Sequence, residues 1–449
     1  MFFKRPKIIP SLGIALAATL LSASAFAQAP TPTPESLSRY LDQIGGMTAD
    51  AAVALALDNN GEILALRKEV ESARALARQA RLRANPSIGF DRREQVGGPD
   101  NNTVVGASLP LELGGRRSAR TRVAEAELDV SEHRLADSER LLAGAVRAKF
   151  GEALAQTLRL KTTEDLVDYA LQEFRLIQSR VVEGKIAPLD EGMAAVELNR
   201  IRSLLENESG KTEVVFFELR NLLGLPPDEP LRLRGSIEVA IRPSASLAED
   251  VQRALRTRPD LLAFRSEEAV ANAKIEKSRA DGRLDARISA DYQRNDFGFP
   301  VRGIDQTGAL RPVQDVFHSV RVGVTFEVPV LNANQGAIES AVALAEAAEK
   351  RREFAELIVR REVSAAHAKY ESASRALEIF RVRVHGQANS NLEVVRQTYE
   401  FGARNLIDYL NEQRRVLDIE NEFIAAQLAV YLAKIELQRS INAPELTNK

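Results

Sequence analysis

Two aspartates occupy equivalent places in the chain, each six residues after a glycine. Asp190 follows Gly184 and Asp408 follows Gly402, and the two sets are 218 positions apart. Carboxylates that symmetry gathers around an axis attract cations, so these aspartates could form an acidic ring. An aspartate that begins a helix is equally well explained by the helix macrodipole, and both explanations can hold together. The glycines are typical of tight turns that end a helix in the left-handed conformation.

The sequence contains no recognisable catalytic motif. The HExxH, GxSxG, GxGxxG and P-loop patterns are absent, and so is cysteine. His367 and His385 share a helix face, but five turns, about 27 Å, separate them, which is too far for one metal ion. The other histidines are His133 and His318. We therefore expect no catalysis, no cofactor and no metal site, with the histidines in surface or packing roles.

Long helical hairpins must position the two aspartates. The hairpins cover residues 116–223 and 336–441, and each reads as a long helix, a glycine turn and a shorter returning helix. We expect the first long helix to reach about residue 181, roughly 100 Å at 1.5 Å per residue, and the second to cover about 334–399. Apolar residues at alternating steps of three and four predict coiled-coil seams on the returning helices. Only Glu208 and Thr212 interrupt the first of these seams.

Each hairpin is preceded by two short segments with strand character. The four predicted strands are residues 87–96, 103–113, 288–297 and 318–329, with a polar loop expected over 297–317.

The last strand shows the clearest two-sided pattern. Alternate residues from Val320 to Val328 are apolar, whereas Arg321 and Glu327 lie on the opposite face. This pattern fits a membrane barrel with lipid outside and water inside, and it fits an amphipathic sheet on a soluble core equally well. The long hairpins favour the barrel, because they extend away from the sheet and nothing else in the chain could cover its apolar face. Four strands cannot close a barrel, so several copies must contribute strands. Arg92, on the apolar face of its strand, stays unexplained.

The first residues predict export. A basic stretch, an apolar run over residues 8–21 and the sequence Ala25-Phe26-Ala27 are typical of a secretory signal peptide, with the mature chain starting at Gln28. The absence of cysteine excludes an N-terminal lipid anchor. The formal net charge of −2 argues against a nucleic-acid partner. The expected divisions are a signal peptide (1–27), a proline-rich tether (28–47), repeat 1 (48–224), a linker or equatorial segment (225–246), repeat 2 (247–442) and a tail (443–449).

Taken together, the duplicated order of strands and hairpins and two sequence stretches resemble the TolC-like outer-membrane efflux proteins. One stretch is residues 399–413, YEFGARNLIDYLNEQ. The other is LELGGRRSAR at 111–120, which follows Asn85-Pro86 and is most similar to the cobalt–zinc–cadmium efflux branch. The resemblance covers essentially all of the mature sequence. It implies a mainly α fold with a small β-barrel portion, a trimeric α/β barrel with four strands and long helical hairpins per chain.

For function, the resemblance implies a homotrimer with a twelve-stranded barrel in outer-membrane lipid of a Gram-negative cell and a twelve-helix periplasmic tunnel. Its implied partners are a periplasmic adaptor and an inner-membrane pump of the resistance–nodulation–division type. The cargo would be divalent metal cations, with drug efflux or type I secretion as alternatives. A periplasmic coiled-coil scaffold without a pore is a third reading.

The same resemblance assigns roles at the hairpin turns, which would form the periplasmic aperture. Tyr399 and Arg404 would bond Asp190 between neighbouring hairpins and hold the aperture shut, and Asp408 would line the constriction. Asn411 stands where some relatives have a second acid, so the resemblance does not extend to a double acidic ring.

Overall fold

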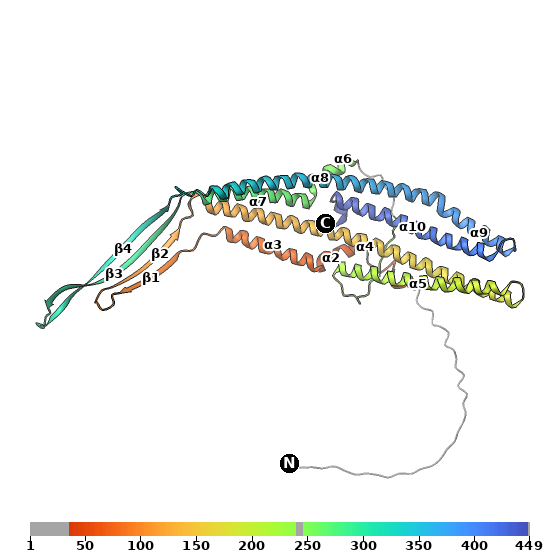
Figure 1. Cartoon of the computed structure of the whole chain (residues 1–449), viewed down its shortest axis with the longest axis horizontal. Helices are drawn as coiled ribbons and strands as arrows, with labels where there is room; N and C mark the ends of the chain where they lie inside the picture. The colour runs from red at the N-terminus through yellow and green to blue at the C-terminus, as the bar shows by residue number, and fades with distance from the viewer. Residues whose placement is uncertain (1–35, 239–245, 448–449) are drawn as a thin grey trace, which may run out of the picture.

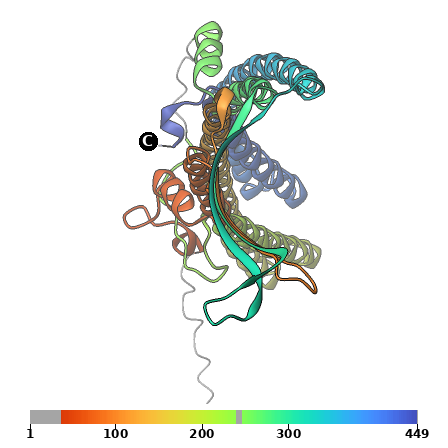
Figure 2. The same ribbon diagram turned by 90° about the vertical axis from the view of Figure 1, so that its left-hand side faces the viewer.

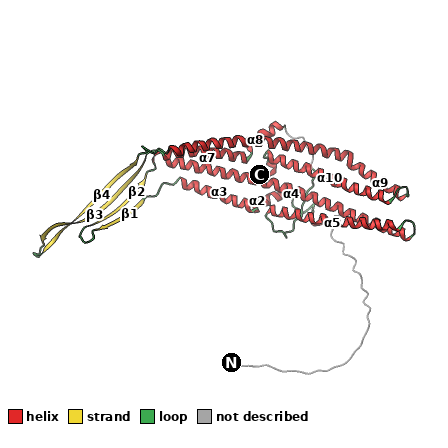
Figure 3. Ribbon diagram, viewed as in Figure 1, coloured by secondary structure: helices red, strands yellow, loops and turns green. Residues whose placement is uncertain are grey.

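The computed structural model describes residues 36–238 and 246–447, and Figure 1 shows them as a long, narrow body. Helices form most of its length, and the strands are gathered at one end (Figure 3). The predicted signal peptide, the mature N-terminus and the first part of the tether lie outside the described residues. No helix in the described ranges is both long enough and apolar enough to cross a membrane.

Both halves of the chain use the same order of elements: a helix pair, two strands and a long hairpin. The helices of the first half are α2 (Ala49–Asn59), α3 (Gly61–Ala80), α4 (Arg116–Val182) and α5 (Pro188–Leu223), after a short α1 (Ser36–Tyr40). Those of the second half are α6 (Leu247–Thr257), α7 (Pro259–Asp281), α8 (Gln335–Phe380), α9 (Gly386–Glu400) and α10 (Leu406–Ser440). Short 3-10 turns lie at Leu113–Gly115 and Pro444–Leu446. α4 has 67 residues, so the prediction of a helix of roughly 100 Å is confirmed.

α2 and α3 are separated at Asn60, whose side chain caps α3 by accepting from the backbone of Glu62. Two predicted elements of the helical body differ from the structure. The second long helix contains a π-turn at Arg381–His385, which joins α8 to α9. The last part of the expected tether is also not free of the body. Both Leu41 and Met47 form β-bridges with Leu233, which is fully buried.

The four strands form one antiparallel sheet in the order β1 (Ser87–Glu94), β2 (Asn101–Pro110), β3 (Asp285–Ile304) and β4 (Leu310–Glu327). The prediction of a polar loop over 297–317 was wrong, because β3 and β4 continue through it to a turn at Gly308. A register shift between Phe299 and Arg302 accommodates Pro300, which has no backbone N–H for the ladder.

Strand register aligns apolar residues of all four strands in adjacent rows on one face. Val105 lies opposite both Phe90 and Tyr292, and Tyr292 lies opposite Val320. The adjacent rows on this face are also apolar: Ile88, Ala107, Ala290 and Val322, then Leu109, Ile288 and Val324. Figure 2 shows that the sheet is strongly curved.

Arg92 lies at the boundary of this apolar face. Its row continues through Thr103, Arg294 and His318, all polar, and its guanidinium pairs with Glu94 at 2.6 Å. This row directly follows the Phe90 row, so Arg92 ends the apolar rows and does not interrupt them.

The main hydrophobic core lies at the middle of the body, where α2, α4 and α5 meet the Leu233 segment. Phe150 of α4 and Phe216 of α5 are almost fully buried there, and the ring of Tyr40 lies 4.7 Å from that of Phe216. Leu446, near the C-terminus, belongs to the same cluster. The long helices α4 and α8 run from the sheet past this centre, and the hairpin turns lie at the end opposite the sheet (Figure 1).

Candidate functional site

The glycine turns of the two hairpins lie at the end of the molecule opposite the sheet (Figure 1). Gly184 has φ +71° and Gly402 has φ +74°. At the first turn the N–H of Gly184 donates to the carbonyl of Val181, and the N–H of Lys185 donates to that of Arg180. Gly402 and Ala403 repeat both bonds at the second turn. These are Schellman turns, in which only glycine adopts the left-handed position without strain, so the glycines have the structural role expected.

Behind the turns the two hairpins pack against each other within one chain. Ile177 of α4 and Ala194 of α5 are buried against Leu406, Tyr409 and Leu410 of α10. We call this cluster the hairpin joint. Leu392 and Val395 of α9 pack against this cluster. Apolar residues about one helical turn apart supply these contacts, which is why the returning helices keep alternating steps of three and four.

An aromatic pair borders the hairpin joint. Tyr399, at the end of α9, stacks on Tyr409 of α10, with ring centroids 5.6 Å apart and planes 3° apart. Burial raises the pKa of Tyr409 because the ionised phenol would lose its water. Both phenols are therefore neutral at physiological pH.

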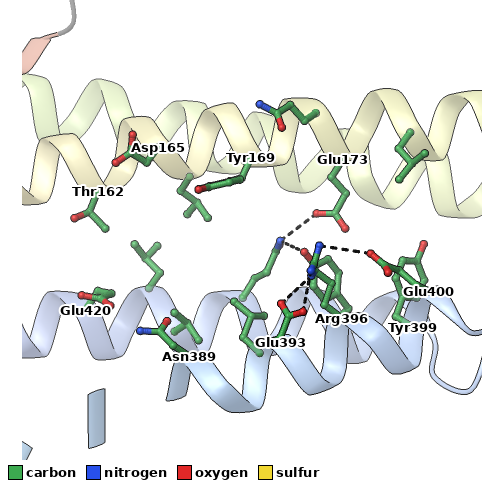
Figure 4. Close-up of a pocket in the computed structure, with 18 of the residues that line it drawn as sticks. Thr162, Asp165, Tyr169, Glu173, Asn389, Glu393, Arg396, Tyr399, Glu400 and Glu420 are labelled. Carbon is green, nitrogen blue, oxygen red and sulfur yellow. Dashed lines mark hydrogen bonds and ion pairs between the residues drawn. The ribbon is translucent and has the colours of Figure 1, made fainter. Parts of the chain in front are cut away.

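A groove of about 680 Å³ runs between α4 on one side and α9 and α10 on the other. Figure 4 shows acidic and aromatic side chains reaching into it from both sides, with Glu173 pointing from α4 toward α9. Arg396 pairs with Glu393 at 2.9 Å and with Glu400 at 3.6 Å. The further charged residues of its lining are Asp165, Arg180 and Glu420. Acids outnumber bases in the groove.

Two glutamates join the hairpins, and they differ in protonation. Burial raises the pKa of Glu173 to about 7, although the side-chain amide of Gln413 lowers it by donating to Glu173 Oε2 at 3.1 Å. Burial alone would also raise the pKa of Glu197. Hydrogen bonds from Arg200 and Arg414 outweigh this effect and lower that pKa to about 2. Glu197 is thus an ionised link between α5 and α10, whereas Glu173 titrates near neutrality.

The structure places the predicted site residues around this region without joining all of them. Asp190 and Asp408 lie in the first turns of α5 and α10, where the macrodipole favours them. The N–H of Asp408 donates to the Asn405 side chain at 2.8 Å. Arg404 and Asn411 are exposed.

The predicted bonds to Asp190 do not occur within the single chain. In the described ranges Asp190 has neither an ion pair with Arg404 nor a hydrogen bond with Tyr399, although its charge contributes to raising the Tyr399 pKa. Contacts of this kind between neighbouring copies stay a prediction.

Glu173, Glu197 and Arg414 were missed from the sequence. One signal for Arg414 was present: it lies four residues after Leu410 and three before Leu417, which is a seam position. A charge in an apolar seam needs a partner, and Glu197 supplies it. Glu208, the exception noted in the other seam, is likewise buried and accepts from Gln156 at 2.6 Å.

No group of histidine and acidic side chains in the described part of the chain is arranged to hold a metal ion. His133 hydrogen-bonds Ser266 at 3.0 Å, and His318 bonds Tyr292 at 2.6 Å. His367 lies 3.7 Å from Glu371 of the next turn. The described histidines thus have packing or surface partners.

Comparison with known proteins identifies the family. The family model described as "Outer membrane efflux protein" matches residues 52–225 and 251–443, most of the chain. The chain belongs to the outer membrane efflux protein family. Members of this family are outer-membrane transport channels rather than enzymes, and this chain is an outer-membrane protein of that kind.

Curated relatives are similar over most of the sequence. The cobalt-zinc-cadmium resistance protein CzcC of Cupriavidus metallidurans is 24% identical over 433 residues, covering 95% of this chain and 98% of CzcC. The nickel-cobalt-cadmium resistance protein NccC of Alcaligenes xylosoxydans xylosoxydans is 26% identical over 359 residues, covering 78% of this chain and 72% of NccC.

Solved structures share the fold. The chain superposes on CusC with a TM-score of 0.73 at 17% identity, covering 92% of this chain and 97% of CusC. A membrane protein of Pseudomonas aeruginosa gives a TM-score of 0.73 at 21% identity, covering 95% of this chain and 96% of that protein. The MtrE channel of Neisseria gonorrhoeae, solved in its open state, gives 0.70 at 17% identity, covering 88% of each chain. The predicted TolC-like fold is therefore confirmed for the single chain.

Proposed function

We propose that this protein is the outer-membrane channel of a tripartite efflux system that exports divalent metal cations. It works as a homotrimer, joined to a periplasmic adaptor and an inner-membrane resistance–nodulation–division pump. The observation that carries the proposal is the open, curved sheet with one continuous apolar face. Among the residues that the structure describes, its edge strands β1 and β4 each have a strand partner on one side only. Unpaired strand edges in lipid cost several kcal/mol per backbone group, so further copies that pair with both edges are required.

The metal cargo is inferred from the two curated relatives, whose names refer to cobalt, zinc, cadmium and nickel resistance. A strain that lacks this gene is expected to stop growing at lower zinc, cobalt or cadmium concentrations, while its tolerance of hydrophobic drugs stays unchanged. Minimal inhibitory concentrations for both classes measure this, with the complemented strain as the control. Loss of drug tolerance alone would assign the channel to drug efflux instead.

The pore-free periplasmic scaffold considered from the sequence is set aside, because the family consists of outer-membrane channels. Fractionation tests the proposed assembly: the channel is expected in the outer-membrane fraction as a trimer in detergent. Recovery as a monomer would contradict the trimer.

The aperture of this channel is proposed to lie at the glycine turns. Arg404 and Tyr399 of one hairpin bond Asp190 of a neighbouring hairpin in the closed trimer, and Asp408 lines the constriction as a ring. Arg404 is exposed in the single chain and Asp190 is half-buried, so both side chains are accessible to a second copy.

Arg404→Ala and Asp190→Ala are each expected to raise single-channel conductance in a planar bilayer severalfold, because the closed aperture loses an ionic contact. Arg202→Ala, which removes an exposed arginine farther along α5, serves as the control and leaves conductance unchanged. Wild-type conductance in both aperture variants would refute this gate.

A further inference from the structure

Glu173 is the polar side chain of α4 that reaches across the groove to the second hairpin. Its Oε2 accepts from Gln413 Nε2 at 3.1 Å, and the same amide donates to the Tyr409 hydroxyl at 2.7 Å. Through Gln413, the carboxyl is connected to the stacked pair of Tyr399 and Tyr409. Hydrogen bonds thus link α4 to α10, and ring stacking extends the contact to α9.

The surroundings of Glu173 offer little compensation for a negative charge. Arg396 on α9 is already shared by Glu393 and Glu400. Arg180 on α4 lines the groove, and neither arginine forms an ion pair with Glu173 in the ranges that the structure describes. The remaining helix of the joint, α5, contributes two further acids, Asp190 and Glu197. Glu197 is paired with Arg200 and Arg414. Burial disfavours an ionised Glu173 in this setting, and the hydrogen bond from Gln413 offsets this effect only in part.

We propose that the hairpin joint is a pH-sensitive latch, which holds while the Glu173 carboxyl is protonated and loosens when that carboxyl ionises. When α9 and α10 move away from α4, Glu173 enters water and releases its proton to the solvent. The Glu197–Arg414 ion pair stays charged near neutral pH and keeps α5 joined to α10 while Glu173 titrates. This proposal deepens the proposed channel function. Only the conductance measurement described below depends on that function.

The direction of the pH effect follows from proton uptake. The closed joint, in which burial raises the pKa of Glu173 to about 7, binds more protons than the open one, in which the carboxyl is an ordinary exposed glutamate. Closure is therefore favoured at low pH and weakens as the pH rises through neutrality. Between pH 5 and pH 8 the ratio of open to closed joints should rise on the order of 10- to 100-fold.

The distance between the hairpin turns can be measured directly. The chain has no cysteine, so spin labels can be attached to Val182→Cys and Phe401→Cys, two exposed positions beside the turns. The full-length protein in detergent, with labelled chains diluted among unlabelled ones, is examined by electron–electron double resonance from pH 5 to pH 9. The wild-type background is expected to give one short distance at pH 5 and a longer, broader distribution above pH 7.

Two variants identify the titrating group. Glu173→Gln is expected to keep the short distance at every pH, because its amide cannot ionise. Gln413→Leu removes a donor to the charged form and is expected to move the transition to higher pH. Glu206→Gln makes the same chemical change at an exposed site on α5 and keeps the wild-type transition.

A wild-type distance that does not change with pH, or a transition that persists in Glu173→Gln, would overturn the latch. Single-channel conductance over the same pH range forms a separate arm. If the distances respond while conductance does not, the latch stands and the aperture proposal fails.

Discussion

Arg414→Leu is expected to separate the ends of the two hairpins more than any other change at the hairpin joint. Glu197 is only 4% exposed, and Arg414 is its partner from the opposite hairpin. The variant leaves this buried carboxylate with Arg200 alone, at 2.7 Å on its own helix. Removing one member of a buried pair costs about 3–5 kcal/mol. The remaining arginine and the partial exposure of Arg414 reduce the expected cost to roughly 2–3 kcal/mol.

Hydrogen–deuterium exchange across residues 399–413 measures this loss. Protection there should fall by on the order of 30- to 100-fold, as expected when opening becomes easier by this free energy. Arg415→Leu is the matched control, because Arg415 is the next residue and its side chain is 68% exposed. Equal protection in the two variants would contradict a role for the pair.

The effect of Arg414→Leu should not depend on pH between 5 and 8. The pKa of Glu197 is lowered to about 2, so its contribution to stability is complete above the usual glutamate range and is lost only as the pH falls toward 2. This behaviour is opposite to that of Glu173, which allows the two contacts of the joint to be distinguished in one experiment.

Arg147→Leu is expected to detach the C-terminal segment from the core. Arg147 of α4 is buried, and its guanidinium donates to the carbonyls of Glu445 and Leu446, both at 2.8 Å. It also pairs with Asp50 at 2.5 Å. The variant leaves these acceptors without a donor, at about 1–3 kcal/mol for each buried group. Leu446, which is fully buried in the main core, then loses the hydrogen bond from Arg147 to its carbonyl.

Carboxypeptidase digestion of the folded protein reports this detachment. We expect a loss of roughly 2–4 kcal/mol for local opening, equivalent to on the order of 30- to 1,000-fold faster trimming of the C-terminal residues. Arg122→Leu removes an exposed arginine from the same helix and should leave the digestion rate unchanged. Resistance of Arg147→Leu to trimming would show that Leu446 is held by packing alone.

Local patterns in the sequence predicted the two long hairpins and both turns, but not the π-turn that divides the second long helix. The glycine turns, the proline at the start of α5 and the steps of three and four are all determined by residues close together in the chain. The paired extension of β3 and β4 was missed because Gly298, Pro300 and Gly303 normally interrupt a strand. In the structure each strand supplies the other's hydrogen bonds, and a register shift absorbs the proline.

The contacts within the hairpin joint could not be predicted in the same way. Glu173 and Gln413 are 240 positions apart, and neither residue type reveals its partner. The bridges from Leu41 and Met47 to Leu233 also join residues far apart in the sequence. Such pairs depend on how whole hairpins pack, which periodicity along a single helix does not specify.

The π-turn at Arg381–His385 makes the two hairpins mechanically unequal. α4 is one uninterrupted helix, whereas the second long helix is divided 15 residues before its turn, the length of α9. Those residues form a lever of about 22 Å. A change of roughly 10° at the π-turn, a known site of helix bending, therefore moves Glu400 sideways by about 4 Å. The returning helix α10 has no matching break, so such a bend would shift α9 relative to α10 and to the first hairpin.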